Sequence, residues 1–137
     1  MIKFLAALIV LCSAPLAAQE TYPSKPIRIL VGYAAGGGND IIVRVMQPEL
    51  QKGLGQPVIV DNKPGAQGII AAEQAARAAP DGYTLMMGPS GPMTINPATY
   101  SKLPYSPTRD FAPISMIASF PLIPRSIQSC RSATCRS

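Results

Sequence analysis

Residues 27–40 combine an apolar segment, three consecutive glycines and the first residues of a helical pattern. The segment from Ile27 to Val31 is interrupted only by Arg28, which is typical of a strand covered on both faces. The glycines at 36–38 carry no side chains, so their N–H groups can form a concave nest that faces an anion. This stretch therefore predicts a strand, a glycine turn and a helix start. The glycines either bind an anion there or merely turn the chain.

Helical and strand patterns alternate after the glycines. Asn39 and Asp40 are good N-cap residues, and we expect a helix to residue 54 with a kink or break at Pro48. Its apolar residues at helical spacing are Ile42, Val45, Met46, Leu50 and Leu54. A strand over 58–60, a turn over 61–65, an Ala-rich helix over 67–79 and a strand over 83–87 follow. The order β-α-β-α-β predicts an α/β fold with a parallel sheet and right-handed crossovers.

The remainder of the pattern is weaker. Residues 93–113 are rich in Pro, Asn, Ser and Tyr, and we expect an irregular segment on the surface. A fourth apolar run covers 114–118, which makes four strands the expected total.

Two loops are expected at the carboxyl edge of this sheet, where ligands bind in open parallel sheets. In the simplest winding the first and third strands are neighbours, which places loops 33–40 and 88–92 beside one crevice. Backbone amides, the positive end of the following helix and the Ser90 hydroxyl suit a carboxylate or a phosphate. Asp40 is either a structural cap or a site residue that pairs with a ligand amine or orders a water. The glycines match neither a P-loop nor a dinucleotide fingerprint.

Composition excludes several classes of function. The chain has 137 residues, enough for one ordinary domain, and a net charge of +5. Residues 19–124 hold eight basic and seven acidic residues, so no basic patch indicates nucleic-acid binding. The chain has no His and no Cys between residues 13 and 129, which argues against Ser–His or Cys–His catalysis and against a metal site. We expect no enzyme activity, no catalytic residue and no cofactor.

The two ends of the chain differ from the middle. Residues 1–18 have a short positive start, an apolar run and small residues, which predicts a cleaved signal peptide and export. Leu11 argues against a lipoprotein site at Cys12. Residues 125–137 have no period, and their composition predicts disorder. Cys130 and Cys135 could form a short-loop disulfide in an oxidising compartment.

Six motifs in order closely resemble the Bug family, the extracytoplasmic solute receptors of tripartite tricarboxylate transporters. The motifs are Tyr22–Ile27, Gly36–Asp40, Leu54–Val58, Asp61–Ala66, Ala79–Leu85 and Ile95–Pro97. The resemblance implies a periplasmic-binding-protein-like fold of type II, the Venus flytrap, in which two α/β domains close on a small carboxylic acid. It also implies delivery of that ligand to the membrane permease subunits of the transporter. The ligand-binding residues that it implies are Tyr33, Ala34, Gly36, Gly37, Gly38, Asn39, Asp40, Ser90, Gly91 and Met93.

The resemblance ends near residue 122, and family members are more than twice as long. We therefore expect a partial solute-binding domain over 19–124, which is only the N-terminal part of the first domain. Such a truncated receptor would bind weakly or not at all, and residues 125–137 would be a frameshift product. The alternative is a small, secreted, non-catalytic interaction domain whose Arg/Cys tail is native.

Overall fold

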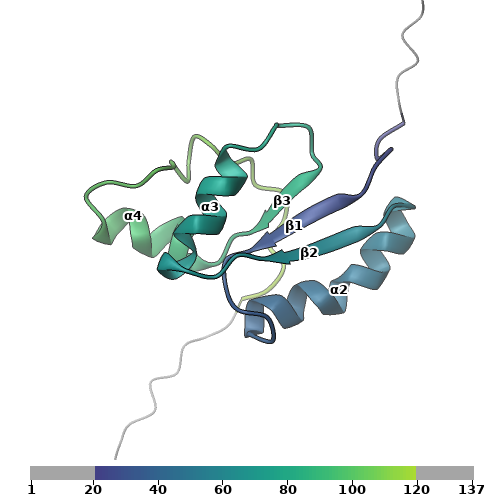
Figure 1. Ribbon diagram of the computed structural model, residues 1–137, viewed down its shortest axis with the longest axis horizontal. Coiled ribbons are helices and arrows are strands. Elements are labelled where there is room, and N and C mark those ends of the chain that lie inside the picture. Colours follow the sequence, from purple (N-terminus) through teal and green to yellow (C-terminus); the bar gives the residue numbers. More distant parts are fainter. Residues whose placement is uncertain (1–20, 120–137) are drawn as a thin grey trace, which may run out of the picture.

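The computed structural model describes residues 21–119, and they form a three-stranded parallel sheet (Figure 1). Its strands are β1 (Ile27–Val31), β2 (Val58–Asn62) and β3 (Thr84–Met87), in the order β2-β1-β3. The expected parallel α/β arrangement, with the first and third strands as neighbours, is confirmed. The signal peptide over 1–18, the lipoprotein site at Cys12, the tail over 125–137 and the Cys130–Cys135 disulfide lie outside the described residues.

Two helices cover the sheet. The helix α2 (Gly38–Leu54) connects β1 to β2, and α3 (Ile69–Ala76), preceded by the 3-10 turn η2 (Ala66–Gly68), connects β2 to β3. The step from β1 to β2 and the step from β2 across β1 to β3 run in opposite directions along the sheet. Right-handed crossovers therefore place α2 and α3 on opposite sides of the sheet, as Figure 1 shows. A π-helical turn, η3 (Gly91–Ile95), and the single-turn helix α4 (Asn96–Thr99) follow β3. No helix within residues 21–119 is both long and apolar enough to cross a membrane.

Every residue of the central strand β1 except Arg28 is buried. Alternate residues of a strand face opposite sides of the sheet, so β1 is buried on both faces. Ile29 and Val31 form a core with Val43 of α2 and Val58 of β2. On the other side, Gly32 lies so close to α3 that a Cβ atom there would be 2.9 Å from the Cα of Gly68. This close approach brings the start of α3 directly against the end of β1.

The helix α2 differs from the sequence prediction in two respects. It continues through Pro48 as one helix, so the expected break does not occur. Its buried residues are Asp40 and Val43, whereas Val45, one of the apolar residues at helical spacing, is 72% exposed. The buried side of the helix therefore starts from a charged residue, which an apolar periodicity cannot reveal.

Three other segments also differ from expectation. Asp61 and Asn62 belong to β2 and pair with Leu30 and Val31, so the predicted turn begins two residues later. Part of the predicted irregular segment is helical, from η3 into α4. Residues 111–119 form no fourth strand, and Ile114 and Met116 are largely exposed.

We predict that Gly32→Ala lowers the free energy of unfolding by about 1–3 kcal/mol, because its methyl group would collide with the backbone of Gly68. The control is Gly53→Ala in α2, where a Cβ atom meets nothing within 4 Å. That change should raise stability by up to about 1 kcal/mol, because Ala favours helix. Urea unfolding followed by far-UV circular dichroism measures both, and equal effects would contradict the close packing of β1 on α3.

Candidate functional site

The candidate site lies at the carboxyl edge of the sheet, where the three strands end in register. Val31 pairs with Asn62 on one side and with Met87 on the other. The loops that follow β1, β2 and β3 therefore start from the same edge, which is where open parallel sheets bind ligands.

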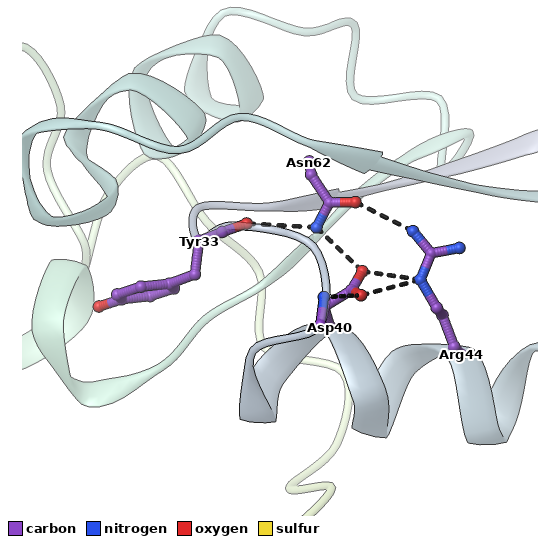
Figure 2. Close-up of polar contacts among 5 residues, drawn as sticks. Tyr33, Asp40, Arg44 and Asn62 are labelled. Carbon is purple, nitrogen blue, oxygen red and sulfur yellow. Dashed lines mark hydrogen bonds and ion pairs between the residues drawn. The ribbon is translucent and has the colours of Figure 1, made fainter.

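A buried carboxylate organises the first of these loops. The side chain of Asp40 is almost wholly buried, and its Oδ2 accepts a hydrogen bond from the Gly36 amide at 2.7 Å. The Arg44 Nε lies 3.0 Å from Oδ1 and 2.9 Å from Oδ2, and the Asn62 Nδ2 donates to Oδ1 at 2.9 Å (Figure 2). Hydrogen bonds from Arg44 first, then from Gly36 and Asn62, lower the pKa of Asp40 to about 2. Asp40 is therefore ionised at neutral pH and has donors on several sides.

Asn62 extends this network to the backbone of the loop. Its Nδ2 also donates to the Tyr33 carbonyl oxygen at 3.2 Å, while its Oδ1 accepts from the Arg44 Nη2 at 3.1 Å. Figure 2 shows the three polar side chains around one point, with the Tyr33 ring directed away from them. We call Asp40, Arg44 and Asn62 the Asp40 cluster. It ties the end of β2 and the first turns of α2 to the loop after β1.

The helix start differs from the sequence prediction. The N-cap of α2 is Gly37, without a side-chain capping bond, so the expected capping by Asn39 or Asp40 is wrong. Asp40 is the third helical residue, and its carboxylate reaches back beyond the N-cap to Gly36. This arrangement is similar to a capping box, extended by one residue toward the N-terminus. The structural role of Asp40 is therefore to fold the loop over the helix end.

The glycine amides divide into two groups. The amides of Gly36 and Gly37 donate to acceptors inside the loop, which are the Asp40 carboxylate and the Ala34 carbonyl at 3.2 Å. Each amide has one hydrogen, so these two are occupied in this conformation. Gly38 and Asn39 open the helix, where amides have no acceptor in a preceding turn. The donors that the loop offers to an external anion are thus at the helix start.

The loops after β1 and β3 meet at Gly91. A Cβ atom built on Gly91 would lie 2.6 Å from the Tyr33 hydroxyl and 3.8 Å from the Gln67 carbonyl oxygen. Ser90 is exposed at the start of this turn, and Met93 packs on Gly88. The predicted residues of both loops therefore lie at one edge of the sheet. Of the first loop, Ala34, Gly36 and Gly38 are exposed, whereas Asp40 is buried.

Sequence reasoning did not identify Arg44, Asn62 and Gln67 as residues of this region. The spacing of four between Asp40 and Arg44 was a usable signal, since such pairs face each other on a helix. The sequence predicts a turn over 61–65, whereas Asn62 is the last residue of β2. The turn before α3 carried only its Gly-Ala-Gln-Gly composition as a signal.

We predict that Asp40→Asn destabilises the fold, because it removes the charge that Arg44 pairs with and replaces an acceptor by a donor opposite other donors. The matched control is Glu49→Gln, an exposed acid on the same helix, which should change stability by less than about 0.5 kcal/mol. Thermal unfolding of both variants at pH 7 measures the difference. Equal melting temperatures would show that the Asp40 cluster contributes nothing to the fold.

The same carboxylate predicts a pH dependence. The pKa of Asp40 is lower in the folded chain than in the unfolded chain, so ionised Asp40 stabilises the fold at any pH above about 4. This contribution is lost as the pH falls from about 4 to about 2. The stability difference between wild type and Asp40→Asn should therefore shrink across that window in urea titrations. A difference that stays constant down to pH of about 2 would contradict the assignment.

The sequence of residues 42–126 matches the family described as tripartite tricarboxylate transporter family receptors. Among curated proteins, BugT of Bordetella pertussis is 39% identical over 112 residues, which are 81% of this chain and 34% of BugT. The chain thus spans about a third of the length of the curated relatives it matches.

Solved structures agree with this match. MatC from Rhodopseudomonas palustris, with bound malate, is 38% identical with a TM-score of 0.67, over 70% of this chain and 33% of MatC. A structure described as a periplasmic transporter is 50% identical with a TM-score of 0.61, over 63% of this chain and 29% of that one.

Proposed function

This chain belongs to the tripartite tricarboxylate transporter receptor family, and on that premise we propose that its loops at the carboxyl edge bind a small carboxylate. The observation that carries the proposal is the convergence of these loops at Gly91, with the first loop held in shape by the Asp40 cluster. The amides of Gly38 and Asn39 and the hydroxyls of Tyr33 and Ser90 are the donors that we assign to the ligand. Asp40 acts behind the loop and does not contact the ligand.

Malate is the ligand that we propose to test first, because it is bound in the related MatC structure. A carboxylate suits the start of α2, where unpaired amides and the helix dipole both favour an anion. Arg44 is engaged by Asp40 and Asn62, so the donors left for the ligand on the first loop are neutral.

The biological role that we propose follows from the family. The receptor acts in the periplasm after export through the signal segment over 1–18, and it delivers its ligand to the permease subunits of a tripartite tricarboxylate transporter. It has no enzyme activity, since the family is one of receptors. The alternative of an interaction domain with an Arg/Cys tail receives no support from residues 21–119, and its tail lies outside them.

We also propose that the described residues bind weakly on their own. They supply one side of a site, and Ala34, Gly38 and Ser90 at this edge are exposed. Tight ligand sites usually bury most of the ligand surface. An affinity on the order of 1 mM, equivalent to about −4 kcal/mol, is what a site open on its other side would give.

The proposal is tested by titrating malate into the ¹⁵N-labelled chain and following backbone amide resonances. Malate at roughly 10 mM, ten times a millimolar Kd, should shift the amides of residues 34–39 and of Ser90, Gly91 and Met93. The diamide of malate, which has no carboxylate, should leave them unchanged. Equal shifts from both compounds, or none from malate, would contradict carboxylate binding.

A pair of variants tests where the ligand lies. Gly38→Leu places a side chain at the exposed start of α2, and Gly53→Leu places the same side chain near the opposite end of that helix. A Cβ atom meets nothing within 4 Å at either position, so both variants should fold. We expect malate binding to weaken at least about tenfold, equivalent to about 1.4 kcal/mol, in Gly38→Leu only. Unchanged binding in Gly38→Leu would remove the helix start from the site.

A further inference from the structure

The turn between β2 and α3 has a backbone conformation that side chains disfavour. Four consecutive residues have positive φ, namely Gly65 at 131°, Ala66 at 46°, Gln67 at 52° and Gly68 at 85°. Glycine adopts such angles freely, but Ala and Gln do so rarely. Such strained residues persist only where the surroundings hold them, and they gather at functional sites. Contacts to Gln67 and to the following Gly68 hold this turn.

A buried asparagine, Asn96, holds the turn by a hydrogen bond. Its side chain is fully buried, and its Nδ2 donates to the Gln67 carbonyl oxygen at 3.2 Å. Among the described residues, its buried Oδ1 has no hydrogen-bond partner. Buried polar atoms are normally paired, so the hydrogen bond of Asn96 to the turn is made through its N–H group although its own oxygen stays unpaired within residues 21–119. Pro92 completes the support, with its Cγ 3.3 Å from a Cβ atom built on Gly68.

The supported turn faces the two loops already assigned to the ligand. The Gln67 carbonyl oxygen lies near Gly91, and the Tyr33 hydroxyl of the first loop lies near the same residue. Ala66 and Gln67 are themselves exposed, although their supports Asn96 and Pro92 are buried. The strained residues thus present their outer side at the edge where β1, β2 and β3 end.

We propose that the Ala66–Gln67 turn is the third wall of the carboxylate site, beside the loops after β1 and β3 as the first two, and that Asn96 is its positioning residue. This inference rests on the proposed function. The exposed Gln67 amide offers a neutral donor and acceptor, which suit a hydroxyl or a second carboxylate on the ligand. A hydroxy dicarboxylate such as malate has both groups. Asn96 acts through the backbone of Gln67 and does not touch the ligand.

The experiment is the malate titration of the labelled chain, now followed at the amides of Ala66 and Gln67. Their resonances should shift with the same concentration dependence as residues 34–39. Gln67→Ala removes the side-chain amide but keeps the support from Asn96, and it should weaken binding about tenfold without changing the melting temperature. Asn96→Ala should weaken binding by at least as much, whereas Thr99→Ala, an exposed residue of the same helix, should leave it unchanged.

The outcomes separate the two proposals. Shifts confined to residues 34–39 and to Ser90, Gly91 and Met93, with wild-type affinity in Gln67→Ala, would overturn the third wall and leave the proposed function intact. No shift at any amide would overturn both. If Asn96→Ala does not fold, Gln67→Ala alone tests the third wall. Weakened malate binding at an unchanged melting temperature supports the third wall, and unchanged malate binding overturns it.

Discussion

A buried negative charge is stable in a protein only if donors surround it, and the Asp40 carboxylate meets this condition through three separate segments. The Gly36 amide comes from the loop, Arg44 from the next turn of α2, and Asn62 from the end of β2. Because each donor belongs to a different segment, satisfying the charge also places the segments relative to one another. The loop after β1 thus has a shape that exists before any ligand arrives.

The buried Asp40 carboxylate also changes the role of the three glycines at 36–38. They were expected to form a nest for a ligand, yet the amides of Gly36 and Gly37 donate to Asp40 and Ala34. The glycine stretch is therefore partly a structural element that binds the protein's own carboxylate. The donors that face outward are shifted toward the start of α2, by one to two residues along the chain.

The parts of the fold that could be predicted are those with local causes. The strand β1 and its burial follow from an apolar run. The pairing of β1 with β3 follows from the simplest arrangement of right-handed crossovers. Apolar spacing predicts only part of the buried face of α2: Leu50 and Leu54 pack against the core, but the face begins at Asp40 and excludes Val45. Asn62 has turn-type chemistry but lies in β2, where its backbone pairs with Val31 and its side chain donates to Asp40. The support of the 66–67 turn by Asn96 joins residues 29 positions apart, a distance at which local patterns carry no information.

The Asp40 cluster further implies that the loop before α2 can vary in residue type more readily than in length. The Asp40 carboxylate and the Gly36 amide that it accepts from are four residues apart, so they close a short loop of fixed length. One residue inserted between them would leave Val43 in the core and Asp40 beside Asn62, because both contacts depend on the helix alone, but it would move the Gly36 amide away from the carboxylate. A change of length between Gly36 and Asp40 thus costs a hydrogen bond to a buried charge, whereas a change of side chain at an exposed position such as Ala35 does not.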